Sequence, residues 1–533
     1  MRLMEISSHW NIEMTSIQAR VSRGKKYWSI VESRRVNGKP RTTIIEYLGT
    51  ADTLLERLMK QKKPVLRSYS HGDSTALLNA ALELGVVDII NKHVPRGKDG
   101  TRPIRDNLTV GASLVLAALG RACSLTSKRG WYEWCKETSL EYCLKLSLKN
   151  LDSQHFWDQM HTLPEDQIEI IEEEVVKKMV TLYQPDLQTL FFDTTNFFTF
   201  IDSTNEKCTI AKRGKNKQKR GDLRQIGLAL VTTRHEQFPL FHKTYEGNKN
   251  DVTVFKESFG DIVRRLRAIS VELADITLVF DKGNNSKANF ALLDAEESLH
   301  YVGSLVPSHF KELIHEANQN LIPINIEGKQ VLAYKTTREI WGKKRTCVTF
   351  VSELLKDGQI RGVLQHLKKK YKALDEFQRI LRGKKKFTTD EIKERIDSII
   401  EAPFAADILK VEMHSPREFS YYCDFVVFAQ LKNSVFGRQI LVTDHHAWSI
   451  EEIILCYQGK TKIEYCFKNF KNPFHMALRP QFHWTDQKIK VHAFICVVAY
   501  LLAFVVFRKA KDTAHYPHDI DVLLDDLHSI RLA

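Results

Sequence analysis

Several features that would mark a secreted, zinc-binding or membrane protein are missing from this sequence. Its nine cysteines are an odd number and include no Cys-x-x-Cys pair, so we expect neither a disulfide framework nor a cysteine zinc site. No secretory signal opens the chain, and the longest apolar run, residues 493–507, has 15 residues, fewer than a bilayer span needs. We therefore expect a cytoplasmic protein with reduced thiols, no membrane partner and a buried helix near residue 500.

Acidic residues are also fewer than basic ones, and this imbalance suggests a polyanionic partner. The chain has 79 Lys and Arg against 65 Asp and Glu, a formal charge of +14. Residues 1–70 hold 14 basic and 6 acidic residues, a difference of 8. Basic side chains that neutralise phosphates release counterions, which favours binding to nucleic acid. A second basic cluster comprises Lys212, Arg213, Lys215, Lys217, Lys219 and Arg220. We interpret the lysine runs at 368–370 and 384–386 as solvated faces.

The amino-terminal third divides into a strand-like and a helical region. Residues 18–48 alternate as strands do, and Asn37-Gly38 between two such runs predicts a β-hairpin. From about 72 to 183 the apolar spacing is helical, and Pro164 opens a long helix with acids in its first turn. We expect a basic hairpin region at 1–70 and a helical, DNA-binding region at 71–183. A plain packing domain is an equally open alternative for the second region.

The pattern then changes to alternating strands and helices. Strands are expected at 187–193, 197–201 and 226–232, with 238–245 extending the sheet, followed by a helix at 252–268, a strand at 276–281, a helix at 286–293 and a strand at 301–306. Three strands, a helix, a strand, a helix and a strand is the order of an RNase H-like α/β domain. We therefore predict an α/β core in two parts, 184–310 and 441–533. Residues 311–440 are an inserted mixed α/β segment between them.

Two acids share one predicted position in this core. Asp193 and Asp281 each end a buried apolar strand, and ligands of open α/β sheets lie at the carboxyl edge of the strands. Two carboxylates placed close together raise one another's pKa, and a hard divalent cation removes that repulsion. Ligation by oxygen alone suits Mg²⁺. The alternative is that each Asp only caps the following turn.

A third acid lies on a predicted helix with two cations and a phenol. Tyr457, Lys460, Glu464 and Lys471 have offsets of 0, 3, 7 and 14, which at about 100° per residue fall within an arc of about 60°. An apolar stripe of Ile463, Phe467 and Phe470 adjoins them. The alternative is an amphipathic helix with a solvated charged edge, and Gly459 can interrupt the helix and displace Tyr457.

The tetrad Tyr-x2-Lys-x3-Glu-x6-Lys resembles the Y-x2-R-x3-E-x6-K signature of bacterial insertion-sequence transposases of the IS-four superfamily. Within it, the chain is most similar to the sixteen-thirty-four family, from the amino-terminal hairpin to about residue 505. The other matching pieces are Phe192-Asp193-Thr194-Thr195, Gly247-Asn248 followed by Asp251, Phe280-Asp281-Lys282-Gly283, Arg479-Pro480, His483 and His492. Lys460 stands where the family has Arg, which keeps the charge but loses the bidentate fork.

The resemblance implies a DDE transposase with an RNase H-like core and an insertion between the second Asp and the Glu. Asp193, Asp281 and Glu464 would bind two Mg²⁺ ions, or Mn²⁺ in their place, for cleavage of phosphodiesters and joining of 3′-OH ends by in-line transfer. The implied partners are double-stranded DNA, as terminal inverted repeats and target, and a second copy of the chain on that DNA. The implied location is the bacterial cytoplasm, at the nucleoid. Tyr457, Lys460 and Lys471 would contact DNA, and the cluster at 212–220 would position its backbone without reading sequence.

Two other functions stay open. One is an RNase H-like nuclease such as a junction resolvase, which the long insertion and the tetrad disfavour. The other is a catalytically silent, transposase-derived DNA-binding regulator, which the presence of all three acids disfavours. Trp341 and Trp448 are candidate base-stacking platforms, although packing is the favoured role for both. We reject a metal site at His445-His446, because no further ligand has suitable spacing in the sequence.

Overall fold

The computed structural model describes residues 15–36, 39–60, 67–97, 100–124, 126, 128–202, 204–216, 218–269, 276–383, 387–472, 474–479 and 482–533. Its contacts divide the chain into two units, residues 1–68 with residue 533, and residues 69–532. Each unit has its own secondary structure.

The first unit is a three-stranded antiparallel sheet followed by one helix. Its strands are β1 (Thr15–Ser22), β2 (Lys25–Val36) and β3 (Lys39–Gly49), and its helix is α2 (Ala51–Lys60). Arg23 and Gly24 turn the chain between β1 and β2 with φ of 48° and 73°, a conformation that glycine adopts without steric cost. The predicted hairpin corresponds to β2 and β3, which pair as far as Val36 and Lys39. Its predicted turn, Asn37-Gly38, lies outside the described residues.

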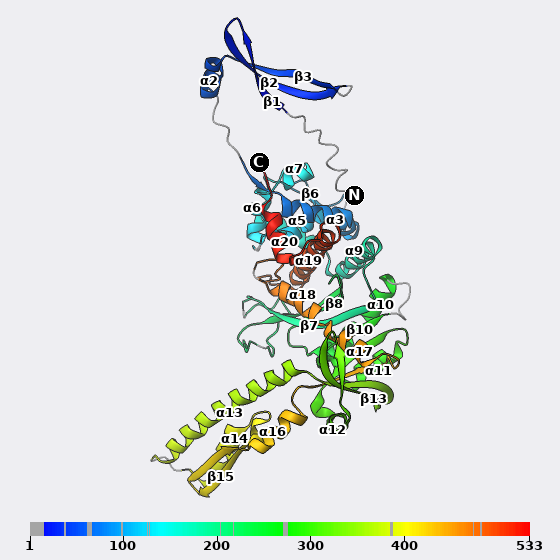
Figure 1. Ribbon diagram of the computed structural model, residues 1–533, viewed down its shortest axis with the longest axis vertical. Helices are drawn as coiled ribbons and strands as arrows, with labels where there is room; N and C mark the ends of the chain where they lie inside the picture. Colours follow the sequence, from blue (N-terminus) through cyan, green and yellow to red (C-terminus); the bar gives the residue numbers. More distant parts are fainter. Residues whose placement is uncertain are drawn as a thin grey trace. The chain divides into compact units, whose positions relative to one another are not determined.

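The second unit begins with a group of helices, several of which pack directly against one long apolar helix, α19 (Asp486–Ala514) (Figure 1). They are α3 (Gly72–Glu83), α4 (Val86–His93), α5 (Val110–Cys123), α6 (Lys128–Lys136), α7 (Leu140–Leu144), α8 (Ser153–Thr162) and α9 (Ile168–Tyr183), with α20 (Ile520–Ser529). Short two-stranded pairs join β4 (Tyr69–Ser70) to β18 (Arg531–Leu532) and β5 (Ile104–Arg105) to β6 (Leu108–Thr109). Side-chain caps begin α5 and α8, where Thr109 accepts from the Ala112 N–H and Asp152 from the His155 N–H.

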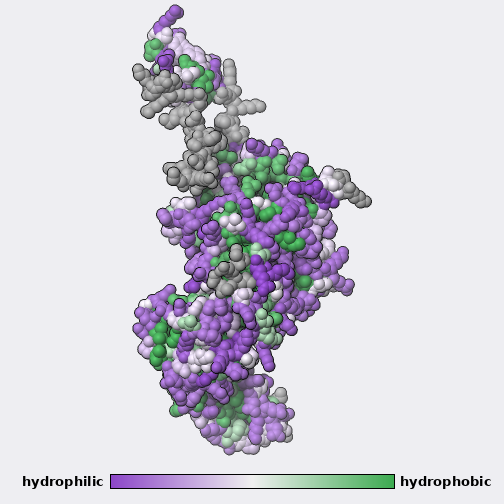
Figure 2. All heavy atoms as spheres, turned by 90° about the vertical axis from the view of Figure 1, so that its right-hand side faces the viewer, coloured by the Kyte–Doolittle hydropathy of each residue, from purple (hydrophilic) through white to green (hydrophobic). Residues whose placement is uncertain are grey.

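Among the described residues, α19 is the one helix long and apolar enough to cross a membrane, and 94% of its most apolar window is buried inside the protein. This burial is typical of a core helix, as the sequence predicted near residue 500. On the face that Figure 2 draws, hydrophilic side chains predominate and hydrophobic ones form scattered patches.

A nine-stranded mixed sheet follows, with the order β12-β13-β14-β17-β11-β10-β7-β8-β9. Its strands are β7 (Thr189–Phe198), β8 (Gln225–Thr233), β9 (Pro239–Glu246), β10 (Thr277–Val279), β11 (His300–Leu305), β12 (Ile322–Ile326), β13 (Lys329–Ile340), β14 (Lys343–Val351) and β17 (Arg438–Thr443). Strands β7, β10 and β11 are mutually parallel, and every other neighbouring pair is antiparallel. Helices α10 (Asp251–Ile269) and α11 (Lys287–Ala295) connect β9, β10 and β11. All nine residues of β8 are buried, as expected for a strand covered on both faces.

One predicted strand boundary is wrong. The expected strands 187–193 and 197–201 form the single strand β7, because every residue from Leu190 to Phe198 pairs with β8. Asp193 therefore lies in the middle of a strand and not at its end.

The predicted insertion, residues 311–440, has two structural parts. Helix α12 (Lys311–Asn320) and strands β12, β13 and β14 extend the large sheet through β17. The rest builds a second hydrophobic core (Figure 1). It consists of α13 (Glu353–Leu381), α14 (Thr389–Ile400), α15 (Ala405–Ile408), β15 (Leu409–Ser415), β16 (Glu418–Cys423) and α16 (Phe425–Ser434). Lys368 and Lys369 are exposed on α13, as expected, and residues 384–386 lie outside the described residues.

Candidate active site

The sheet register places Asp193 and Asp281 at the same level on neighbouring parallel strands. Thr277 pairs with Thr189 and Val279 with Phe191, so positions in β10 and β7 differ by 277 − 189 = 88. Asp281 lies two residues beyond β10, and 281 − 88 gives Asp193. Asp281 caps the 3₁₀ turn at Lys282–Asn284, where its carboxylate accepts the Lys282 N–H at 2.8 Å. The capping role that was the alternative for Asp281 thus occurs together with its proximity to Asp193.

The two carboxyl groups differ in their electrostatic surroundings. Burial raises the pKa of Asp193 to about 6, and the negative charges of Asp281 and Asp251 act in the same direction. The hydrogen bond from the Thr194 N–H acts to lower this pKa. Burial also acts to raise the pKa of Asp281, but the positive charge of Lys460 and hydrogen bonds from the Lys282 N–H and Tyr457 hold that pKa below its usual value. Ionisation of Asp193 is therefore less favourable than ionisation of Asp281.

A third aspartate, Asp251, completes the acidic group. It is the first residue of α10 and accepts the Thr194 hydroxyl at 2.7 Å, next to Asp193 in the chain. A Cβ atom on Gly283 would lie 2.9 Å from its Oδ2, so Asp251 also borders the turn that follows Asp281. In the sequence, Asp251 stands out only through the family resemblance. Its position, the first residue of the helix that follows the third paired strand, is the signal that could have revealed it.

The predicted tetrad helix is two helices, α17 (Ile450–Gln458) and α18 (Thr461–Lys471). Gly459 and Lys460 join them with near-helical φ of −56° and −58°. A Cβ on Gly459 would lie 2.6 Å from the Phe191 ring, so glycine allows this junction to rest on β7. The junction interrupts the helix as considered above, yet Tyr457 is not displaced from the site. Its hydroxyl donates to Asp281 Oδ1 at 2.9 Å.

Lys460 connects the strand-end carboxylate to the helix. Its Nζ lies 3.3 Å from Asp281 Oδ2 and 3.5 Å from Glu464 Oε1. Burial acts to lower the pKa of Lys460, but Tyr457, Asp281 and Glu464 outweigh it and raise the pKa, so the side chain stays cationic. The Glu464 side chain is 54% exposed, which leaves its carboxylate accessible to a ligand.

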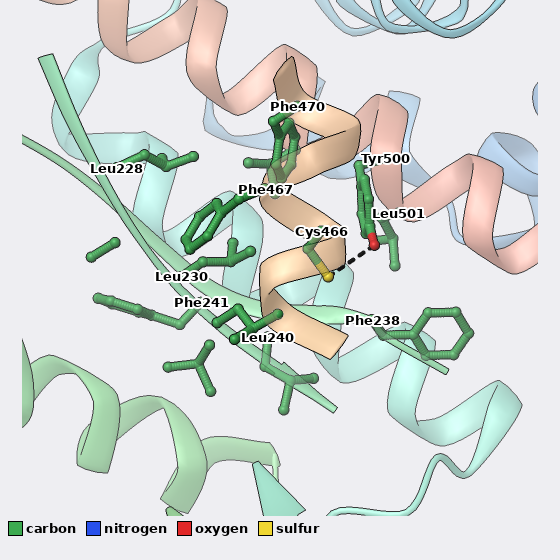
Figure 3. Close-up of a cluster of buried hydrophobic side chains, with 14 of the residues drawn as sticks. Leu228, Leu230, Phe238, Leu240, Phe241, Cys466, Phe467, Phe470, Tyr500 and Leu501 are labelled. Carbon is green, nitrogen blue, oxygen red and sulfur yellow. Dashed lines mark hydrogen bonds between the residues drawn. The ribbon is translucent and has the colours of Figure 1, made fainter. Parts of the chain in front are cut away.

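The packing of α18 fixes the direction of these polar side chains. Ile463, Cys466, Phe467 and Phe470 are buried, and Figure 3 shows the last three packed between β8, β9 and α19. The Tyr500 hydroxyl of α19 donates to Cys466 Sγ at 2.9 Å within this cluster. At the carboxyl end of α18, Lys471 Nζ lies 2.5 Å from the Thr195 hydroxyl. The tetrad therefore faces the segment of β7 that contains Asp193.

The basic cluster at 212–220 lies in the connection between β7 and β8, at the carboxyl end of β7. Two of its cations contact nearby acids: Lys212 Nζ is 3.0 Å from Glu246, and Arg220 is 2.6 Å from Asp222. Arg213, Lys215 and Lys219 are exposed, and Lys217 lies outside the described residues. Asp486 at the start of α19 anchors the same connection by accepting the backbone N–H groups of residues 209 and 210. The loop is thus held at the carboxyl end of β7, and Arg213, Lys215 and Lys219 are exposed on it.

The two tryptophans considered as base-stacking platforms are partly buried packing residues. Trp341 lies 4.5 Å from the Phe290 ring, and Trp448 stacks on His445 with ring centroids 3.7 Å apart. The packing interpretation agrees with both arrangements.

Comparison with known proteins identifies the first unit. Residues 16–69 match the IS1634 family transposase, N-terminal domain. No curated protein matches the chain. Among solved structures, the cryo-EM structure of a piggyBac transposase synaptic complex with hairpin DNA is similar with a TM-score of 0.41 and 9% identity, over 85% of this chain and 79% of that chain. The family match agrees with the predicted family resemblance, and it covers residues 16–69.

Proposed function

We propose that this chain, which carries the N-terminal domain of an IS1634 family transposase, is a DNA transposase that cleaves phosphodiesters at terminal inverted repeats and joins the 3′-OH ends to target DNA. The main support for this proposal is the strand register, which brings Asp193 and Asp281 to the same level on neighbouring strands. Lys460 pairs with both Asp281 and Glu464. Lys460 thus joins a carboxylate beside the sheet to the carboxylate of α18.

The donor set fits Mg²⁺, and Mn²⁺ in its place. Asp193, Asp281 and Glu464 offer carboxylate oxygens, which hard divalent cations prefer. The pKa of Asp193 is raised by burial and, to a smaller extent, by the negative charges of Asp281 and Asp251, and a bound cation would offset both effects. When bound, two ions supply activation of water or of a 3′-hydroxyl and stabilisation of the leaving oxygen. Asp251 supports the site by holding the Thr194 hydroxyl beside Asp193.

We propose an RNase H-like catalytic core for the sheet region. The chain order β7, β8, β9, α10, β10, α11, β11 supports it, and so does the spatial order β9-β8-β7-β10-β11, in which only β8 is antiparallel to its two neighbours. The segment between β11 and α17 then interrupts the core before its third carboxylate.

The cations of the site would hold the DNA backbone. Without DNA, Lys460 pairs with Asp281 and Glu464. Those carboxylates would hold the metal in the loaded enzyme, which would leave Lys460 available to a phosphate oxygen. Lys471 is two turns beyond Glu464 on α18, and Arg213, Lys215 and Lys219 add exposed cations in the connection that follows β7. Such contacts position DNA without reading its sequence. Tyr457 orients Asp281 through its hydroxyl.

The partners follow from this chemistry. We propose that double-stranded DNA, as terminal repeats and as target, binds the basic cluster and the first unit, and that two copies of the chain assemble on it. The expected location is the bacterial cytoplasm, at the nucleoid.

Joining of DNA ends tests the function against both alternatives. The full chain is incubated with Mg²⁺, a labelled terminal-repeat duplex ending in a 3′-OH, and a supercoiled target plasmid. A transposase forms covalent products that contain both DNAs. Nicked or cut DNA without joined products indicates a nuclease or resolvase, and binding without any cleavage indicates a silent DNA-binding regulator.

A further inference from the structure

We propose that His300, Asp444 and His445 bind one divalent transition-metal ion of the zinc type. This group lies beside the amino ends of the parallel strands β7, β10 and β11, away from the three carboxylates of the candidate active site. Each residue offers one ligand atom, and the three atoms lie within 4.8 Å of one another. His300 begins β11, whereas Asp444 and His445 directly follow β17, so 144 residues separate the first ligand from the second. The absence of a nearby third ligand in the sequence therefore does not exclude a metal here.

This cluster is separate from the candidate active site. Thr277, whose hydroxyl lies 2.8 Å from His445 Nε2, pairs with Thr189 at the amino end of β7. Asp193 is four residues further along β7, roughly 13 Å away at about 3.3 Å per residue. A metal at this edge would contact none of the three carboxylates.

The three side chains are held in place by neighbouring groups, as metal ligands are. Asp444 Oδ1 accepts the Tyr301 N–H at 3.0 Å, and its Oδ2 lies 2.8 Å from His300 Nδ1. The His445 ring stacks on Trp448, with an interplanar angle of 5°. Lys335 Nζ donates to the carbonyl oxygens of residues 446 and 448, at 2.9 Å and 2.6 Å, and so fixes the loop that carries two of the three ligands.

The ligand chemistry favours a borderline ion over Mg²⁺. Two imidazoles and one carboxylate suit Zn²⁺ and similar transition metals, whereas Mg²⁺ prefers oxygen alone. Ligand atoms around a tetrahedral ion with bonds of about 2.0–2.1 Å are roughly 3.3 Å apart, so a small inward movement would close this group on the metal. A metal bound at His300 Nδ1 would replace any proton there, and that proton would move to His300 Nε2 or to solvent.

Three protein ligands leave a fourth position for water or another small ligand. His300, His445 and Trp448 line a cavity of about 550 Å³, together with Thr277, Arg234 and Glu452. The cavity gives an ion a path from solvent. A bound ion would also tie the start of β11 to the end of β17, two strands that are neighbours in the sheet.

Metal binding by the full-length protein tests the proposal. The protein is stripped with a chelator, and Zn²⁺ affinity is measured by competition with Co²⁺, whose visible absorption reports tetrahedral coordination, in a millimolar excess of Mg²⁺. We expect one tightly bound ion per chain. His300→Gln and His445→Gln should each weaken Zn²⁺ binding by more than about 10-fold, the lower end of the loss seen when only a group supporting a ligand is removed. Zn²⁺ should also raise the melting temperature of the wild type but not of these variants.

Two further variants make the result specific. His446→Gln changes the adjacent, exposed histidine, which contacts Thr346 and lies outside the group, and should bind Zn²⁺ like the wild type. Asp193→Asn, which alters the other edge of the sheet, should also keep the tight ion, so this test is independent of the proposed catalysis. If a histidine variant does not fold, Asp444→Asn repeats the measurement, because it keeps an oxygen for the Tyr301 N–H. Equal Zn²⁺ affinity in the wild type and the ligand variants, or loss of the ion in Asp193→Asn alone, would overturn the proposal.

Discussion

Replacing Asp193 by Asn should stabilise the metal-free protein while removing a ligand that the proposed reaction needs. Burial and two neighbouring carboxylates raise the pKa of Asp193 from 3.8 to about 6. A carboxyl group whose pKa is higher in the folded than in the unfolded state destabilises the fold once it ionises. That cost is absent below the unfolded pKa and fully present above pH 6. Asn keeps an oxygen for the Thr194 N–H, which Asp193 accepts at 2.8 Å, but carries no charge.

A shift of about two pKa units corresponds to roughly 3 kcal/mol, and partial exposure of the side chain reduces this to about 1–3 kcal/mol. Thermal unfolding at pH 7.5 without metal should therefore show Asp193→Asn melting a few degrees above the wild type. The difference should stay nearly constant from pH 7.5 to about 6 and shrink as the pH falls below 6 toward 4. Mg²⁺ should raise the melting temperature of the wild type more than that of the variant.

Asp281→Asn is the matched control, because the same change should have the opposite sign there. Lys460, Tyr457 and the Lys282 N–H stabilise the Asp281 carboxylate and lower its pKa, so its neutral replacement should lower the melting temperature at pH 7.5. A wild-type or lower melting temperature for Asp193→Asn, or a rise for Asp281→Asn, would refute this account of the acidic group.

Three other predictions concern the helix junction and the cations. Lys460→Ala and Lys471→Ala should each slow single-turnover cleavage by about 10- to 100-fold, since a charge-assisted contact to phosphate is worth roughly 1.5–3 kcal/mol. Lys460→Arg should be tolerated. Wild-type rates in both alanine variants would mean that α18 has only a supporting role. Joint replacement of Arg213, Lys215 and Lys219 by Gln should reduce the salt dependence of DNA binding, with a log–log slope smaller by up to about 3; an unchanged slope would place the DNA elsewhere. Gly459→Ala should destabilise the protein by about 1–3 kcal/mol, because its Cβ would lie 2.6 Å from the Phe191 ring; an unaltered unfolding midpoint would show that the ring yields freely.

Sequence patterns predicted the order of the strands and helices well where apolar runs are bounded by turn residues. Residues 226–232 are an example, since the buried run lies within β8. The same reasoning divided β7 wrongly, because the polar residues 193–196 look like a break, although their backbone groups pair with β8 throughout. Pairing of this kind depends on a partner strand that no local pattern reveals.

The sequence predicted which residues form the candidate site but not which contacts they make. Helical spacing grouped Tyr457, Lys460 and Glu464, and Gly459 stood out as a residue that can interrupt the helix. The sequence did not reveal that the junction rests on Phe191 of β7. Asp251 is 58 residues from Asp193 along the chain, and only the fold brings it to the Thr194 hydroxyl. The group of His300, Asp444 and His445 likewise exists only because β17 pairs with β11.

Cleavage of a pre-bound terminal-repeat duplex by single-residue variants is the most direct test of the central claim. Asp193→Asn, Asp281→Asn and Glu464→Gln are each saturated with DNA, Mg²⁺ is added, and the rate of strand cleavage is measured beside DNA affinity. The proposed mechanism predicts that each variant binds the duplex nearly as the wild type does and cleaves it at least about 1000-fold more slowly, a loss of roughly 4 kcal/mol of transition-state stabilisation. Cleavage near the wild-type rate by any one of them would show that its side chain does not hold the metal.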